Sequence, residues 1–246
     1  MYNSTINTLL NHRSIRKFKD QPLTDEQIKL LVTCAQAAST SSFTQSFSII
    51  GVEDPEIKKE LSQISGQSYV EENGYFFVFV ADQYRNHQIG DQHDADTSVL
   101  DTTQRLTVAL GDAAFAAQNM AIAAESMGLG ICYIGSIQNN IQRTADLLQL
   151  PKYTFPVFGM AVGYPDQTPE KKPRLPFNAV FHKNVYRKTT SNDELNGYDD
   201  QVANYYSTRS GGQRNETWTQ QIAEGLSAPA RMALKPFLEK QQLGKR

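Results

Sequence analysis

The chain has 246 residues, of which 39% are hydrophobic and 20% are charged, and its formal net charge is −2. This length is enough to bury one sizeable core, as one domain or as one domain with an excursion. The slightly acidic balance, without a basic block, disfavours a nucleic-acid partner. No basic N-terminal start precedes an apolar run, so we expect no signal peptide.

The first part of the chain predicts alternating helices and strands. Apolar residues at helical spacing predict a helix over 5–11. Thr24 begins a capping box for a second helix that ends near Ala38. Further along we predict a strand over 47–52, a helix from Asp54 to about Ile64 that stops at Gly66, and a buried strand over 76–81. Residues 83–104 are polar and predict no regular element.

A long alanine-rich helix is predicted over 107–127. Its many small residues would let another helix approach closely, which suits a central or subunit-interface helix. Gln118 and Asn119 interrupt its apolar stretch, so we expect a core helix and no membrane span. Gly128 and Gly130 end it. A strand over 131–134, a helix over 141–148 and a strand over 157–162 follow, so helices and strands mix in one α/β domain.

The remaining sequence has a different character. After Gly163 it is rich in proline and lysine and then polar and aromatic, with helices predicted near 193–206 and 229–241. We therefore expect a core over 1–165 and an extension over 166–246 that wraps a neighbour or covers a site. Cys34 and Cys132 lie far apart, outside any C-x-x-C pattern, and we interpret both as small buried hydrophobic residues. This usage fits a reducing cytoplasm and disfavours a disulfide framework or a zinc site.

Two basic stretches could bind an anion. The first follows the first predicted helix and comprises His12, Arg13, Ser14, Ile15 and Arg16. The second contains Lys172 and Arg174 around a proline that fixes the backbone. A guanidinium presents a planar fork that matches phosphate oxygens. Taken alone, the first stretch is better explained by a solvated basic turn and the second by a surface linker.

Polar and glycine-containing loops form the other candidate sites. Hydroxyl and amide side chains that suit a polyol or an amide edge are Ser39, Thr40, Ser42, Gln45 and Gln67. An ordinary capped loop is the alternative for 39–45. Arg209 and Arg214 flank a glycine-rich loop and could grip the phosphates of a transient ligand, or lie on a simple surface loop.

The segment from Gly128 to Ser136 fails the G-x-G-x-x-G pattern, because Tyr133 stands at the last glycine position. It also follows a helix instead of a strand, so a Rossmann site is disfavoured. Gly135 after the strand could let the backbone approach a flat ring closely. A helix stop plus a tight turn is the alternative. The sequence also lacks H-E-x-x-H, G-x-S-x-G and P-loop motifs, and its histidines have no metal-ligand spacing.

Taken together, these stretches resemble the nitroreductase family, in its branch of NADPH-dependent flavin reductases and oxygen-insensitive nitroreductases, and in particular its Gram-positive members. The resemblance covers nearly the whole chain, and the order and spacing of the stretches are specific. The matching stretches are 12–16, 38–42, 118–119, 123–130, 133–135, 172–176, 205–206 and 216–218.

The resemblance implies an α+β, nitroreductase-like fold: a mixed sheet flanked by helices, with a C-terminal extension, in an intertwined homodimer with two FMN sites at the interface. It implies hydride transfer from NADPH to tightly bound FMN and then two-electron transfer to nitroaromatics, quinones or free flavin, a ping-pong cycle without a protein nucleophile. One alternative is a dedicated FMN reductase that supplies free reduced flavin. A non-catalytic flavin-binding protein is an alternative of a different class.

The same resemblance implies residue roles. The FMN phosphate would be held by His12, Ser14, Lys172 and Arg174, with Arg13 in support. Arg16 would lie near the flavin N1/O2 edge. The ring and ribityl chain would contact Ser39, Thr40, Ser42 and Gln45, and the polar edge of the ring would contact Gln67 and Tyr69. Backbone approach is implied for Tyr133, Ile134, Gly135 and Ser136. NADPH phosphates would be attracted by Arg209 and Arg214.

Two features depart from the family pattern. Ser136 stands where similar proteins usually have a second glycine, which bears on backbone contact there. The stretch 85–104 is matched poorly, and acceptor preference is expected to depend on it.

Overall fold

The structure is a computed structural model that describes residues 2–188 and 192–246. The chain divides into two compact units. The first unit consists of the chain up to Thr168 together with Arg231–Arg246, and the second unit is Pro169–Ala230. The C-terminal sixteen residues therefore pack with the N-terminal part of the chain, although they follow the second unit in sequence.

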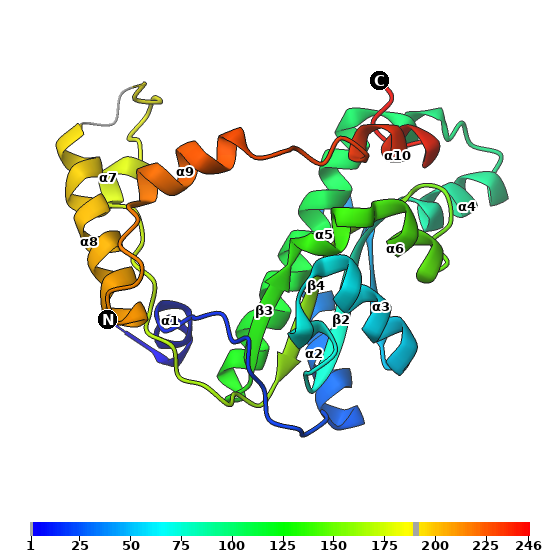
Figure 1. The fold of residues 1–246 in the computed structure, drawn as a ribbon. Helices are drawn as coiled ribbons and strands as arrows, with labels where there is room; N and C mark the ends of the chain where they lie inside the picture. Colours follow the sequence, from blue (N-terminus) through cyan, green and yellow to red (C-terminus); the bar gives the residue numbers. More distant parts are fainter. Residues whose placement is uncertain (1, 189–191) are drawn as a thin grey trace. The chain divides into compact units, whose positions relative to one another are not determined.

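A four-stranded sheet forms the centre of the first unit (Figure 1). Its strands, in spatial order, are β1 Phe47–Val52, β2 Tyr75–Asp82, β4 Thr154–Gly163 and β3 Gly130–Ile134. Each neighbouring pair is antiparallel, so the mixed sheet implied by the family resemblance is not what the described strands form within this chain.

Strand β2 explains why strand direction could not be inferred from its apolar run. Phe76 and Val78 pack into one core cluster with helix α3 (Pro55–Ser65). Phe77 and Phe79 pack into the opposite cluster with helices α2 (Asp25–Gln36) and α5 (Thr103–Ser126). A strand covered on both faces is apolar at every position, whatever the direction of its neighbours. The run indicates burial, and the pairing direction is set by the connections between strands.

The helices of the first unit are α1 Ser4–Leu10, α2 Asp25–Gln36, α3 Pro55–Ser65, α4 Tyr84–Gln92, α5 Thr103–Ser126, α6 Ile141–Leu147 and α10 Leu234–Lys240. The second unit contains α7 Phe177–Val180, α8 Asn192–Ser210 and α9 Trp218–Ser227. Single turns of 3-10 helix lie at η1 Ser41–Phe43, η2 Ser68–Val70, η3 Ser98–Asp101 and η4 Gly135–Asn140.

Most predicted elements are confirmed, and the exceptions have physical reasons. Helix α4 was not predicted, and every one of its residues is at least partly exposed, so it leaves no apolar periodicity in the sequence. Helix α9 was not predicted either. The helix predicted over 229–241 begins only at Leu234.

The long helix α5 is a core helix, as predicted. By length and composition alone Thr103–Ser126 could cross a membrane. In the fold, however, Ala113, Ala117 and Ala121 are buried in the cluster that α5 shares with α2 and the sheet. The small side chains allow α2 to pack against α5, which confirms the close helix approach that the sequence indicated.

The second unit has a small aromatic core. Tyr198, Val202, Tyr205 and Tyr206 of α8 are buried together, and Trp218 of α9 packs against them. Thr217 caps α9 through a capping box with Gln220. The unit is thus held by tyrosine and tryptophan rings more than by aliphatic side chains.

The two cysteines are both free thiols. Cys132 is buried, as expected, whereas Cys34 on α2 is only partly buried.

Candidate functional site

The stretch after α1 lies directly beside the beginning of β3. The amide of Ile15 donates a hydrogen bond of 2.9 Å to the carbonyl of Ile131, and the Ile15 side chain is buried. A Cβ added to Gly130 would lie 2.5 Å from Cγ1 and 2.7 Å from Cβ of Ile15. Glycine at 130 is therefore what allows the basic stretch to approach the sheet so closely.

Ser14 and Arg16 lie together with Tyr69 of η2 and Cys132 of β3. Arg16 interacts with the Tyr69 hydroxyl, and the Cys132 thiol interacts with Ser14, Arg16 and Tyr69. Burial raises the pKa of both the Tyr69 hydroxyl and the Cys132 thiol, and the positive charge of Arg16 opposes each shift. We call these four residues the β3 cluster. It places a cation and two hydroxyls beside one strand.

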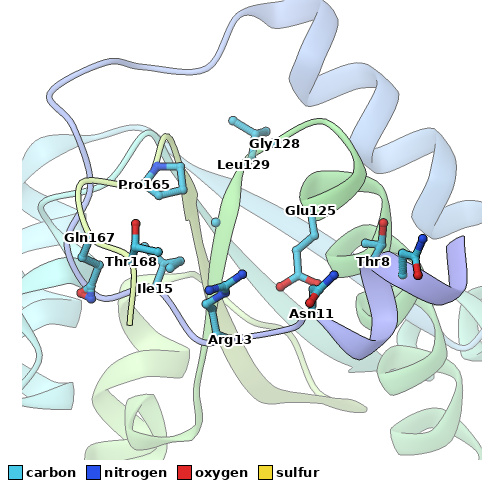
Figure 2. A pocket seen from close by; sticks show the side chains of 12 residues that line it. Thr8, Asn11, Arg13, Ile15, Glu125, Gly128, Leu129, Pro165, Gln167 and Thr168 are labelled. Atoms are coloured by element: carbon cyan, nitrogen blue, oxygen red, sulfur yellow. The ribbon is translucent and has the colours of Figure 1, made fainter. Parts of the chain in front are cut away.

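His12 and Arg13 are associated with Glu125 of α5. His12 Nδ1 lies 2.7 Å from Glu125 Oε1. Arg13 and Glu125 also line a cleft of about 380 Å³ together with Asn11 and Ile15 (Figure 2). The alternation of an extended segment explains this arrangement, because residues 13 and 15 face the cleft while residues 14 and 16 face the β3 cluster.

The loop over 39–45 is held in an unusual backbone conformation. Ser42, Phe43 and Gln45 have φ values of 51°, 56° and 48°, in the left-handed region. Such residues cost on the order of 1 kcal/mol each. The structure places Ser39, Ser42 and Gln45 at the surface and Thr40 partly buried, with the Thr40 hydroxyl accepting from the Gln45 amide at 3.4 Å.

A buried carboxylate fastens both ends of this loop. Asp112 of α5 is 1% exposed. Its Oδ1 accepts from the amide of Ser41 and its Oδ2 accepts from the amide of Ser46, both at 3.0 Å. The loop thus has a fixed attachment to the longest helix of the core.

Helix α4 supports the same loop from the other side. Arg85 donates to the carbonyls of Gln45 and Phe47 at 3.2 and 3.4 Å, and Asn86 donates to the Ser46 hydroxyl at 3.1 Å. The poorly matched stretch 85–104 therefore contacts the loop through its first residues.

Gln67 and the end of β3 complete the first-unit candidates. The amide of Gln67 donates to the carbonyl of Ser62 at 3.2 Å, so the backbone at Gln67 is attached to the end of α3. Burial raises the pKa of Tyr133, and the charge of Glu125 adds to that shift. Beyond Tyr133, the Ile134 side chain is buried.

Gly135 and Ser136 begin η4, where the chain leaves the sheet. A Cβ added to Gly135 would meet no other heavy atom within 4 Å among the described residues. Packing within the chain therefore gives no reason for glycine at 135.

In the second unit, the predicted phosphate clamp and the predicted NADPH grip share one tyrosine cluster. Lys172 Nζ lies 5.3 Å from the centre of the Tyr206 ring, and Arg214 Cζ lies 4.3 Å from it. Arg209 donates to the Tyr205 hydroxyl at 3.0 Å. Cations over aromatic faces are held in place by the ring quadrupole.

We call the cationic side chains of Lys172, Arg174, Arg209 and Arg214 the cationic surface. Two further contacts hold its members. Arg174 donates to the carbonyl of Lys172 at 3.0 Å. Arg214 forms an ion pair with Glu216, with 2.6 Å between Nη2 and Oε2. Residues 172–174 and 209–214 were predicted as separate sites, and spacing alone did not reveal the tyrosine cluster that they share.

Sequence reasoning missed three supporting residues: Asp112, Glu125 and Arg85. A signal existed for Asp112, because it is a single acidic residue within the otherwise apolar and small stretch Ala109–Ala117 at core spacing. A buried acid in such a stretch needs a hydrogen-bond partner. Glu125 and Arg85 lie in helices where charged residues are ordinary, so no comparable signal marks them in the sequence.

Comparison with known proteins bears on the whole chain. The profile of the Nitroreductase family matches residues 9–164, and that of the Nitroreductase family, C-terminal domain, matches residues 172–246. The FMN reductase (NADPH) of Bacillus subtilis is 50% identical over 247 residues, covering 99% of each chain. The NADPH-dependent oxidoreductase of Staphylococcus saprophyticus is 48% identical over 240 residues, covering 95% of each chain.

Solved structures agree with these sequence relatives. The structure of the NfrA1 nitroreductase from Bacillus subtilis superposes with a TM-score of 0.96 at 50% identity, and the match covers 98% of this chain and 100% of that one. Both profiles, the full-length identity and the fold lead to the same assignment. The chain belongs to the nitroreductase family.

Proposed function

We propose that this chain is an FMN-dependent NADPH oxidoreductase that passes electron pairs to nitroaromatics, quinones or free flavin. The observation that carries the proposal is the β3 cluster, where Ser14, Arg16 and Tyr69 lie together at the strand from which the backbone leads to Gly135. Full-length relatives named as FMN reductase (NADPH) and NADPH-dependent oxidoreductase support it.

The donor set fits FMN. A phosphate is met by cations and hydroxyls, which His12, Ser14, Lys172 and Arg174 supply, with Arg13 in support. Hydroxyls and amides for the ribityl chain and the ring are available from Ser39, Thr40, Ser42, Gln45 and Gln67. Gly135 fits a flat ligand, because the space beside its Cα holds no other described part of the chain within 4 Å of an added Cβ. Tyr133, Ile134 and Ser136 flank that position.

When bound, FMN would supply the two-electron carrier chemistry between NADPH and the second substrate. The chain's own residues bind, orient and provide charge. Arg16 supplies positive charge beside the reduced cofactor, and this charge favours the added electron pair. Asp112 and Arg85 hold the loop over 39–45, and Gly130 keeps Arg16 at the strand.

For NADPH we propose Arg209 and Arg214 as phosphate-binding residues. Both are held on tyrosine rings, so the guanidinium groups are partly ordered before a ligand arrives. A 2′-phosphate adds negative charge that NADH lacks, which supports a preference for NADPH.

We further propose a homodimer in the cytoplasm. The segment 177–186 exposes four large apolar side chains: Phe177, Phe181, Val185 and Tyr186. Such a concentration of exposed apolar surface is typical of a protein–protein interface. The two free thiols suit a reducing compartment. Light scattering coupled to size exclusion should give twice the chain mass. A monomer that still binds FMN would overturn the proposed homodimer but not the proposed oxidoreductase activity.

The deciding experiment is spectroscopic. The purified protein should show flavin absorption bands, and anaerobic NADPH should bleach them. Folded protein without affinity for added FMN would overturn the proposal, and flavin that NADPH cannot bleach would favour a non-catalytic flavin-binding protein. A kcat/KM for free FMN that far exceeds that for a nitroaromatic would favour a dedicated FMN reductase.

A further inference from the structure

Asp112 stands out as a charged side chain in the middle of a core helix. It is 1% exposed, and its neighbours Ala109, Ala113 and Ala116 are buried in the hydrophobic core. A carboxylate in such a place is costly unless its oxygens accept good hydrogen bonds. Both oxygens do so, and both donors are backbone amides of one loop.

The two amides bracket the strained part of that loop. Ser41 and Ser46 are the donors, and between them lie Ser42, Phe43 and Gln45 with positive φ. Non-glycine residues keep this conformation only where the surroundings enforce it. Asp112 pins the chain immediately before and after these residues, so it enforces the shape of the loop from inside the core.

We infer that Asp112 is a positioning residue for FMN: it holds the loop over 39–45 in the shape that presents Ser42 and Gln45 to the cofactor. This inference rests on the proposed function, since it requires that the loop contacts FMN. It assigns a binding role to a residue whose carboxylate accepts hydrogen bonds from the backbone amides of Ser41 and Ser46. The position of the loop, and not the mere presence of its hydroxyls, then sets the affinity.

The first test is Asp112→Asn in the full-length protein, measured by titrating the FMN-free protein with FMN. Asparagine has nearly the same shape but replaces one acceptor oxygen by a donor, so one of the two amides loses its partner. A charge-assisted hydrogen bond of this kind corresponds to about a 10- to 100-fold change in affinity. We expect an FMN Kd raised within that range and an altered visible circular dichroism of the bound flavin.

A matched control separates positioning from general destabilisation. Thr154→Val also removes one buried hydrogen bond, from the Thr154 hydroxyl to the Pro151 carbonyl at 2.6 Å, without changing side-chain shape. We expect it to lower the unfolding midpoint and leave the FMN Kd unchanged. If Asp112→Asn lowers the midpoint to the same extent and also leaves the Kd unchanged, Asp112 is only a structural residue and the inference is wrong.

A second variant keeps the test informative if Asp112→Asn folds poorly. Ser41 is the first residue of η1, and proline is tolerated at a first helical position. Thr40 before it is extended, with φ −127° and ψ 151°, as the residue before a proline prefers. Ser41→Pro removes one amide from Asp112 at an exposed position. We expect weaker FMN binding, and we expect the double variant to bind no more weakly than Asp112→Asn alone. Full additivity of the two effects would overturn the inference.

The variant Ser42→Gly distinguishes an error in the role of Asp112 from an error in the proposed FMN site. It removes a hydroxyl proposed to contact FMN, while glycine accepts the left-handed conformation readily. If Ser42→Gly leaves the FMN Kd unchanged, the loop does not contact the cofactor and the proposed function loses this part of its site. If Ser42→Gly weakens FMN binding and Asp112→Asn does not, only the role of Asp112 is wrong.

Discussion

Arg16 lies beside Tyr69 and Cys132 in the first unit. Its guanidinium interacts with the Tyr69 hydroxyl and opposes the pKa shift of the Cys132 thiol, so it acts on groups from two separate elements. Sequence reasoning identified Arg16 and Tyr69 through the family resemblance. It did not place them against Cys132, because a thiol in an apolar run looks like any small buried side chain.

Arg16→Ala should lower the midpoint potential of the bound flavin, since the added electron pair loses a nearby cation. One charged contact in a sheltered site contributes roughly 1.5–3 kcal/mol. For a two-electron couple this corresponds to about 30–60 mV. Dye-equilibration titration measures the potential directly. Arg143→Ala, which removes a surface guanidinium paired with Glu60, should leave it unchanged. An unaltered potential in the Arg16 variant would contradict the role.

Glu216 should weaken NADPH binding in the native protein. Its carboxylate occupies the guanidinium fork of Arg214 that we propose for a phosphate. Glu216→Gln frees that fork, and we expect the KM for NADPH to fall by about two- to fivefold, in line with a partly exposed ion pair. Steady-state kinetics with NADH provides the control, since that substrate lacks the 2′-phosphate. Equal improvement with both nucleotides would argue against recognition of the 2′-phosphate at Arg214.

At the scale of elements, we expect contrasting effects from substitution of two glycines: Gly130 at the start of β3 and Gly135 directly after its end. Gly130→Ala would drive a Cβ into Ile15, so the FMN-free protein should lose about 1–3 kcal/mol of unfolding free energy. Gly135→Ala meets open space within the described chain, so its FMN-free stability should stay unchanged. If the backbone at 135 approaches the flavin, its FMN Kd should nevertheless rise. Urea unfolding and FMN titration of both variants separate packing from cofactor contact.

Element boundaries were predictable where local chemistry marks them. Asp54, Pro55 and Gly66 delimit α3 in the sequence, and the structure confirms all three, with Gly66 left-handed at φ 66°. Strand pairing and helix α4 were not predictable, because the first depends on distant segments and the second buries no residue. The link from Asp112 to the loop over 39–45 spans about seventy residues, so no local pattern contains it.

At the scale of the whole molecule, alkaline pH tests how the sheet is held. Burial and the neighbouring Glu53 carboxylate raise the pKa of Tyr75 from 10.0 to about 12. The neutral phenol is therefore favoured by folding. Its contribution is complete below pH 10 and is lost as the pH rises toward 12. We expect the unfolding free energy to fall across that interval and to fall less steeply in Tyr75→Phe. An identical slope in both proteins would assign the loss to other groups.

The single tryptophan of the chain gives the second unit an optical signal of its own. Trp218 packs edge-on against Tyr198 at 5.6 Å between ring centres, and the Tyr198 hydroxyl donates to the Pro173 carbonyl, between Lys172 and Arg174. Indole emission therefore monitors the backbone of the cationic surface, whereas far-ultraviolet dichroism averages over every helix. A denaturation curve whose two signals separate would reveal that the extension melts independently of the sheet.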